Sequence, residues 1–222
     1  MNLTLFDLDG TLLPIDSDHA FGDFLVRIGW ADAEEHGRRN DEFFAAYQAG
    51  RLDMDDYIGF ATAAWRDRAD DEIAAMSARY MDEVIGPQIR DPARALVERH
   101  RAAGDTLVVV TATNDFITRP IAAAFGVDHL IATDLERDPS GRVTGRVRGV
   151  PALREGKITR VREWLAARRQ ALDDFDSVTF YSDSTNDLPL LEQVTHPVAT
   201  NPGPALAQIA AQRGWPILKL FE

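Results

Sequence analysis

The chain has 222 residues, of which 45% are hydrophobic and 27% charged, a composition typical of a folded globular protein. Its 24 basic and 36 acidic residues give a formal net charge of −12, so it lacks the basic surface with which proteins bind nucleic acid or anionic membranes. It has no cysteine, which excludes disulfides, thiolate metal ligands and a cysteine nucleophile, and no apolar run of membrane-spanning length or signal peptide, so we expect a cytoplasmic protein.

The first predicted element is a short strand that ends in two carboxylates. Leu3–Phe6 is an apolar run that predicts a buried strand, and Asp7 and Asp9 follow it directly. Side chains alternate along an extended backbone, so these two carboxylates start on the same side. They repel each other, so one must carry a proton or a cation must lie between them. Taken alone, Asp9-Gly10 could equally be an ordinary turn.

A helical pattern then runs from about Asp16 to Ile85. Pro14 and Pro87 bound this pattern and are interpreted as the two crossings of an inserted domain. The sequence therefore predicts a helical insert at residues 15–86 within a core formed by residues 1–14 and 87–222.

The remainder of the chain alternates strands with helices, which predicts a Rossmann-like, doubly wound parallel sheet. Its apolar β-type runs predict further strands at 107–110, 129–133, 178–181 and 197–200, with a last helix and short strand after them. Residues 142–147, after the turn at 138–141, predict a small hairpin or flap. Pro120 lies inside a helical pattern and predicts a helix start or a kink nearby.

Polar side chains follow three of the predicted strands. Asp7 and Asp9 follow the first strand, Thr111 the second, and Asp183 and Asp187 the fourth. Because a parallel sheet aligns its carboxyl ends along one edge, these groups can converge on a single crevice. Four carboxylates without cysteine or a histidine pair favour Mg²⁺ at a phosphate-handling site.

Two further groups suit a phosphate. Thr111 offers a hydroxyl and nearby backbone N–H groups close to a predicted helix start. Lys157 lies in the first turn of another predicted helix, where the helix dipole disfavours a cation. We therefore favour a role for Lys157 in the crevice over that of a surface lysine.

Four short segments resemble, in order, the motifs of the haloacid dehalogenase-like phosphohydrolases. They are Asp7-Leu8-Asp9-Gly10-Thr11, Thr111, Lys157 and Ser182-Asp183-Ser184-Thr185-Asn186-Asp187. The helical insert after the first motif resembles the cap of the branch that contains phosphoserine phosphatase. The resemblance covers essentially the whole chain.

The resemblance implies a Mg²⁺-dependent phosphomonoesterase that acts on a small metabolite phosphate. Asp7 would attack phosphorus and become an aspartyl phosphate, and Asp9 would protonate the leaving oxygen and then activate water. The residues implied to hold the phosphate are Thr111, Ala112, Lys157 and Asn186. Mg²⁺ would be held by the Asp7 side chain, the Asp9 main-chain carbonyl and Asp183, with Asp187 supporting its waters.

The match departs from phosphoserine phosphatases where the substrate would be recognised. Asp16 stands where a longer glutamate usually holds the substrate amine, so we expect Asp16 to select the substrate. The arginine that would bind a serine carboxylate has no clear counterpart, and Arg51 and Arg66 are only candidates. An amino-bearing ester without a carboxylate, such as histidinol phosphate, therefore fits as well as phosphoserine.

Two other functions stay open on these residues. A phosphomutase of the same superfamily would keep the phosphoryl group on its product. A receiver-type signalling domain also uses an aspartate, Mg²⁺, a Ser or Thr and a lysine, but its phosphorylated aspartate lies later in the chain and no helical insert follows its first strand. The expected partner is a small phosphomonoester, not nucleic acid or a membrane, and the sequence carries no signal of oligomeric state.

Overall fold

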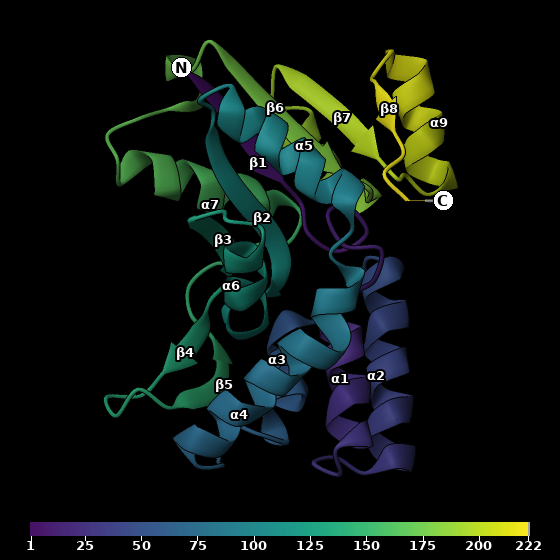
Figure 1. Ribbon diagram of the computed structural model, residues 1–222, viewed down its shortest axis with the longest axis vertical. Coiled ribbons are helices and arrows are strands. Elements are labelled where there is room, and N and C mark those ends of the chain that lie inside the picture. The colour runs from purple at the N-terminus through teal and green to yellow at the C-terminus, as the bar shows by residue number, and fades with distance from the viewer. Residues whose placement is uncertain (222) are drawn as a thin grey trace.

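The computed structural model describes residues 1–221. They form an α/β part and, beside it, a part made of helices, which are called the α/β layer and the helical layer below (Figure 1). Six parallel strands make one sheet in the order β3-β2-β1-β6-β7-β8. Their bounds are β1 Asn2–Phe6, β2 Thr106–Asn114, β3 His129–Thr133, β6 Ser177–Ser182, β7 His196–Thr200 and β8 Ile217–Leu218. The Rossmann-like parallel sheet predicted from the sequence is confirmed.

Helices cover both faces of this sheet. One face packs against α5 (Asp91–Ala102) and α6 (Asp115–Ala124). The other packs against α7 (Glu155–Ala166), α8 (Leu188–Leu191) and α9 (Pro204–Arg213), with short 3₁₀ turns at Leu172–Asp174 and Thr185–Asp187 nearby. Strand β1 contributes to both cores because its side chains alternate: Phe6 points to the first face, and Leu3 and Leu5 to the second.

The helical layer lies beyond the carboxyl ends of the strands and contains the predicted insert, residues 15–86, which we call the cap (Figure 1). Its elements are α1 Ser17–Arg27, α2 Ala33–Gln48, α3 Met54–Ala63, α4 Asp70–Tyr80 and a π-helical turn Met81–Ile85, and a 3₁₀ turn at Gly86–Gln88 leads back to the core. Asp16, Asp32 and Asp53 begin the first three helices, because each carboxylate accepts two backbone N–H groups of the first turn. The cap is therefore organised by local capping as well as by its aromatic core.

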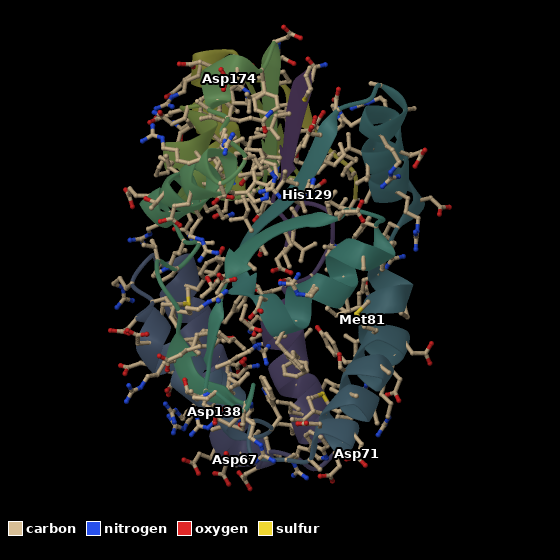
Figure 2. All side chains as sticks on the ribbon, turned by 90° about the vertical axis from the view of Figure 1, so that its left-hand side faces the viewer. Asp67, Asp71, Met81, His129, Asp138 and Asp174 are labelled. Atoms are coloured by element: carbon tan, nitrogen blue, oxygen red, sulfur yellow. The ribbon has the colours of Figure 1, made fainter. Side chains whose placement is uncertain are left out.

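A hairpin of the core reaches down over the cap. Strands β4 (Leu135–Arg137) and β5 (Val143–Val147) pair antiparallel, and β5 packs against α3. In Figure 2, Asp138 at the hairpin tip lies at the same end of the molecule as Asp67 and Asp71 of the cap. The predicted flap thus connects the two layers a second time, away from the crossings.

The structure differs from the sequence prediction around the second strand. Strand β2 runs on to Asn114 through a break in its register with β3, so Thr111 lies inside the strand and not after it. Helix α6 begins at Asp115, five residues before Pro120, because the Asn114 side chain accepts the Ile117 N–H at 3.2 Å and caps the helix. No helix within residues 1–221 has both the length and the apolar character to cross a membrane.

Candidate active site

The central strands bring the predicted site residues to one edge of the sheet. Phe6 of β1 lies level with Val109 of β2 and with Tyr181 of β6. Asp7, Asp183 and Thr111 come just beyond these positions, at the edge that faces the cap. Residues separated by more than 170 positions in the chain therefore meet because three neighbouring parallel strands end together.

Lys157 lies buried between two aspartates of this edge. Its Nζ donates to Oδ1 of Asp7 and to Oδ2 of Asp187, each at 2.7 Å, and only 1% of the lysine is exposed. The Ser182 hydroxyl donates to the same Asp187 oxygen at 2.8 Å. Asp187 thereby positions the ammonium beside Asp7 through charge-assisted hydrogen bonds.

The crevice holds more acidic than basic side chains. Burial raises the pKa of Asp7 to about 7, although the Lys157 ammonium acts to lower it. Burial alone would lower the pKa of Lys157, but the carboxylates of Asp187 and Asp7 raise it, so the lysine keeps its charge. Burial, followed by the nearby Asp7 and Asp187, also raises the pKa of Asp183 well above its usual range. One lysine does not neutralise these acids, so the crevice favours a further cation.

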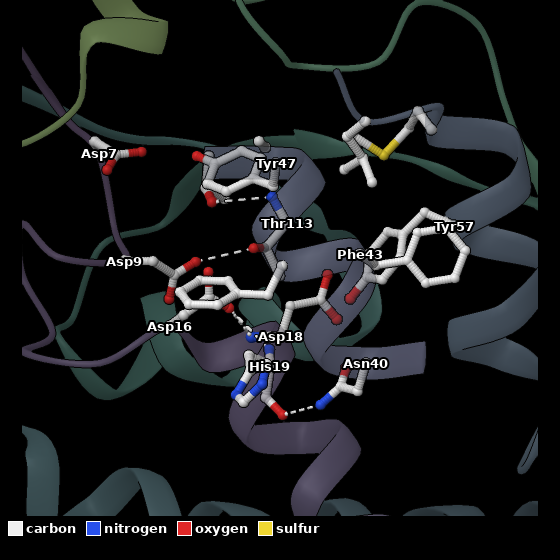
Figure 3. Close-up of a pocket in the computed structure, with 15 residues that line it drawn as sticks. Asp7, Asp9, Asp16, Asp18, His19, Asn40, Phe43, Tyr47, Tyr57 and Thr113 are labelled. Carbon is white, nitrogen blue, oxygen red and sulfur yellow. Dashed lines mark hydrogen bonds between the residues drawn. The ribbon is translucent and has the colours of Figure 1, made fainter. Parts of the chain in front are cut away.

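The carboxylate of Asp9 is held on the cap side of the crevice. Its Oδ1 accepts the Ser17 N–H at 2.7 Å. Its Oδ2 accepts the Thr113 hydroxyl at 2.9 Å, a bond drawn in Figure 3. Burial, then the nearby Asp16, raises the pKa of Asp9 to about 7, while these hydrogen bonds act to lower it. An acid with such a pKa exchanges its proton near neutral pH, as general acid–base catalysis requires.

The donors predicted to hold Mg²⁺ fit that ion. The Thr11 hydroxyl donates to Asp7 Oδ2 at 3.3 Å and to Asp183 Oδ1 at 3.4 Å, so these two carboxylates bracket one small space. Gly10 approaches so closely that a Cβ there would lie 2.3 Å from Asp183 Oδ2. Within residues 1–221 no three His, Cys, Asp or Glu side chains form a metal cluster, but the predicted set needs only two side chains and one main-chain carbonyl. Anionic, hard oxygen donors of this kind suit Mg²⁺.

The residues predicted to hold phosphate occupy three different settings. Thr111 and Ala112 line a pocket above Asp7 and Asp9, and the Thr111 hydroxyl accepts the Thr113 N–H at 3.2 Å. Lys157 lies beside Asp7, as described. The Asn186 amide instead donates to the main-chain carbonyl of Tyr47 in the cap at 3.3 Å, so in this structure that side chain links core and cap.

The pocket lies between the carboxyl edge of the sheet and the cap (Figure 3). It is lined from the core by Asp7, Asp9, Thr111, Ala112 and Thr113, and from the cap by Asp16, Asp18, His19, Asn40, Phe43, Phe44, Tyr47, Leu52, Met54 and Tyr57. The Tyr47 hydroxyl points toward Asp7 in Figure 3. Acidic and aromatic side chains therefore surround whatever molecule is bound above the two catalytic candidates.

Asp16 and Asp18 both line this pocket but are engaged differently. Oδ1 of Asp16 caps α1, accepting the N–H groups of Asp18 at 3.0 Å and His19 at 2.8 Å. Asp18 is 8% exposed, and Asn114 Nδ2 approaches its Oδ1 at 3.5 Å. Sequence reasoning missed Asp18 because two acids near a helix start do not reveal which one caps and which one faces the pocket.

Thr113 and Tyr47 were also missed. Thr113 lies two residues after Thr111 in a strand, so a common side of the backbone could have indicated its contact with Asp9. Tyr47 belongs to an aromatic group at helical spacing that looks like cap core, and no signal in the sequence separates it from Phe43.

Comparisons with known proteins show the family to which the chain belongs. A family model described as haloacid dehalogenase-like hydrolase matches residues 4–192. The chain is 44% identical over 217 residues to a protein of Neisseria meningitidis serogroup C (strain 8013) named histidinol-phosphatase, with 98% of each chain covered. It is 36% identical over 218 residues to a probable phosphatase of Mycobacterium tuberculosis (strain ATCC 25618 / H37Rv), covering 96% of this chain and 73% of that one.

Two solved structures extend the comparison. A protein of unknown function from Bordetella pertussis Tohama I superposes with a TM-score of 0.93 at 50% identity, covering 99% of each chain. A substrate-bound phosphoserine phosphatase superposes with a TM-score of 0.67 at 16% identity, covering 97% of this chain and 91% of that one, a likeness of fold alone.

Proposed function

Because this chain belongs to the haloacid dehalogenase-like hydrolase family and is a phosphatase, we propose that it hydrolyses a small amino-bearing phosphomonoester through a phosphorylated Asp7. The observation that carries the proposal is the placement of Lys157, whose Nζ lies 2.7 Å from both Asp7 and Asp187 at the carboxyl edge of the sheet. A fixed cation beside a carboxylate suits the transfer of a phosphoryl group to that carboxylate.

In the first step, a carboxylate oxygen of Asp7 bonds to phosphorus while the ester oxygen leaves. Asp9 gives its proton to that oxygen, so the product departs as an alcohol. Because the pKa of Asp9 is raised to about 7, its carboxyl group still carries a proton to donate near neutral pH. Lys157 neutralises part of the negative charge on the transferring group.

In the second step, Asp9 takes a proton from a water molecule as that water attacks phosphorus. The bond between phosphorus and Asp7 breaks, inorganic phosphate leaves, and both aspartates return to their starting state. Mg²⁺, bound by Asp7, Asp183 and the main-chain carbonyl of Asp9, would neutralise negative charge on phosphate and nucleophile. Asp187 keeps the lysine in place and supports the metal site from behind.

We take histidinol phosphate and phosphoserine as the first substrates to test. The first is suggested by a relative named histidinol-phosphatase that matches nearly the whole chain. The second is suggested by the phosphoserine phosphatase fold. Both are small esters with an amine, in keeping with the acidic pocket beneath the cap.

The test is release of inorganic phosphate from a panel of small phosphate esters with Mg²⁺, by the wild type and by Asp7→Asn. We expect Asp7→Asn to abolish phosphate release, because an amide does not attack phosphorus, and to leave the circular dichroism spectrum intact, because the side-chain volume hardly changes. Turnover by Asp7→Asn near the wild-type rate would overturn the mechanism.

The same assay separates hydrolysis from phosphoryl transfer within the substrate. A phosphatase releases one phosphate for each ester consumed, whereas a phosphomutase returns an isomeric ester. Mass balance on ester and phosphate therefore tests the alternative directly.

A further inference from the structure

We propose that Asp18 selects the substrate: its carboxylate binds the positively charged group of the ester, and the pocket around it rejects an ester that carries a carboxylate. This inference rests on the proposed function and names the chemical class that the same site accepts. That class is a small cationic phosphomonoester without an acid group.

Asp18 is a buried carboxylate that faces the pocket without a cationic partner. It lies in the first turn of α1 and points toward Phe43 and Tyr57 in Figure 3. The side chains that approach it with a hydrogen-bond donor are neutral: Asn114, with Nδ2 at 3.5 Å, and Tyr57. Across residues 1–221, no Lys, Arg or His forms an ion pair with it.

Burial disfavours the ionised form of Asp18 when no cation is bound. Burial, together with the nearby Asp16 and Asp9, raises the pKa of Asp18 well above its usual range. A buried charge that lacks a partner costs free energy of folding, and an amide or apolar side chain at this position would avoid that cost. A bound cation would supply the missing partner and favour the ionised carboxylate of Asp18.

The walls of the pocket favour an organic cation over a bare metal ion. Phe43 and Tyr57 pack edge to face with ring centroids 5.2 Å apart, and Leu52 and Met54 add apolar surface. Aromatic faces attract ammonium and imidazolium groups, and apolar walls favour the carbon atoms that carry them. Metal ions, by contrast, need several oxygen ligands at once.

The described lining of the pocket supplies no lysine or arginine to pair with a substrate carboxylate. The one basic side chain in the described lining is His19, whose ring nitrogens lie 2.8 Å from Asp41 and 3.6 Å from Asp23. Arg66, a sequence candidate for this role, donates to the Gly59 carbonyl and the Thr62 hydroxyl in a separate groove. Arg51, the other candidate, is exposed and outside the lining.

A substrate carboxylate would therefore enter unpaired beside Asp16 and Asp18. Like charges in a partly dry pocket repel strongly, and an unpaired carboxylate also loses its water. An amino alcohol phosphate avoids both costs. On this basis histidinol phosphate is accepted and phosphoserine is rejected.

The experiment compares kcat/KM, with Mg²⁺, for histidinol phosphate, ethanolamine phosphate, phosphoserine and a neutral aryl phosphate. In the wild type we expect the two cationic esters without an acid group to exceed phosphoserine by about 30-fold or more, since an unpaired buried charge costs about 2 kcal/mol or more. We expect Asp18→Asn to reduce the ratio of kcat/KM for histidinol phosphate to that for the aryl ester by a similar factor. Asp56→Asn is the matched control, because it makes the same change at an exposed cap position and should leave the ratio as it is.

Calorimetric binding of histidinol keeps the proposal testable without turnover. We expect the wild type and Asp56→Asn to bind it and Asp18→Asn to lose that binding while keeping the native circular dichroism spectrum. Equal use of phosphoserine and histidinol phosphate by the wild type, or an unchanged ratio and histidinol affinity in Asp18→Asn, would overturn the inference. If the enzyme hydrolyses the aryl ester through Asp7 but shows no preference for cationic esters, the inference about Asp18 is wrong and the proposed function stands. If no ester releases phosphate, the proposed function has failed, and histidinol binding still decides the role of Asp18.

Discussion

The hydroxyl of Thr113 tunes the proton affinity of Asp9. It donates to Asp9 Oδ2 at 2.9 Å, which favours the ionised carboxylate and acts to lower its pKa. Asp9 must carry a proton in the first step, so kcat/KM should fall as the pH rises through about 7, the pKa of that group. In Thr113→Val the ionised form loses this hydrogen bond, so the pKa of Asp9 rises and the fall in kcat/KM should move to higher pH.

The measurement is the pH profile of kcat/KM for an alkyl phosphate, whose leaving oxygen needs the proton most. Thr144→Val, on the exposed face of β5, is the matched control and should leave the profile in place. If the fall of kcat/KM with rising pH occurs at the same pH in Thr113→Val as in the wild type, or at a lower pH, the role given to Asp9 is contradicted.

The chain has only two lysines, which gives an internal control for the buried one. Lys157 is paired with Asp7 and Asp187, whereas Lys219 is exposed. Lys157→Met leaves two buried carboxylates unpaired, so we expect a loss of about 3 kcal/mol in the free energy of unfolding at neutral pH. We also expect a fall of about 100-fold or more in kcat, because a preorganised cation is removed from the reacting group.

Denaturant unfolding and steady-state kinetics test these losses against Lys219→Met, which should behave as the wild type. The loss of stability should shrink at pH 5, where the orphaned carboxyls can take up protons. An Lys157→Met protein as stable and as active as the control would show that the ion pairs are dispensable.

Between elements, two core side chains fasten the end of α2 to the core. Asn186 donates to the Tyr47 carbonyl at 3.3 Å, and the Arg154 guanidinium donates to the Gly50 carbonyl. Arg154 also has φ 54° and ψ −122°, a backbone conformation that glycine adopts far more easily. Strain at Arg154 is retained where its side chain reaches the cap.

Removing the Arg154 side chain should loosen the cap without unfolding the core. We expect Arg154→Ala to lose amide protection at the C-terminal end of α2 by about tenfold, the equivalent of one hydrogen bond of about 1.4 kcal/mol. Arg154→Gly also loses the guanidinium but relieves the backbone strain, so it should show the same local loosening with higher global stability. Hydrogen exchange measures the first effect and thermal unfolding the second. Unchanged protection at α2 in both variants would show that Arg154 does not hold the cap.

The parallel sheet was predictable because its strands carry continuous apolar runs, and Asp7 and Asp183 because they follow such runs directly. The end of β2 was not predictable in the same way. Its threonines and Asn114 look like a turn in sequence, but a break in register carries the strand through them. Pro120 predicted a helix start or kink near it, but α6 begins five residues earlier because the Asn114 side chain caps the helix there.

The division of roles between Asp16 and Asp18 could not be read from the chain. Both lie near the start of α1, and only the folded backbone shows that Asp16 receives the free N–H groups. Asp18 is then left to face the pocket. The contribution of α2 to the site, through Tyr47 and Phe43, depends on how the cap packs on the core, which is tertiary information.

For the whole molecule, the concentration of acids at one edge links stability to metal and pH. The pKa values of Asp7 and Asp9 are raised from 3.8 to about 7. Between these values the folded protein holds protons that the unfolded chain has released, so the metal-free protein should lose stability as the pH rises from about 4 to about 7. Mg²⁺ binds the ionised native site and should restore stability at neutral pH.

At a Mg²⁺ concentration 100 times its Kd, the gain is about 2.7 kcal/mol, or roughly 5 to 10 °C in Tm for a chain of this size. Thermal unfolding from pH 4 to pH 8, with Mg²⁺ or with chelator, checks both trends, and a phosphatase assay with chelator should show no turnover. Asp183→Asn should remove most of the Mg²⁺-dependent rise in Tm. A metal-free protein whose Tm climbs steadily from pH 4 to pH 7 would contradict the raised pKa values.

The bonds that fasten α2 also bear on how this protein can change over evolutionary time. Arg154 and Asn186 both bind main-chain carbonyls of the cap, at Gly50 and Tyr47, and every residue type presents a carbonyl. The inner surface of the cap can therefore acquire new side chains, at Phe43 or Asp18 for instance, while the attachment to the core persists. Substitutions in the cap alone can therefore change which substrates the protein accepts, while the residues around Asp7 stay the same.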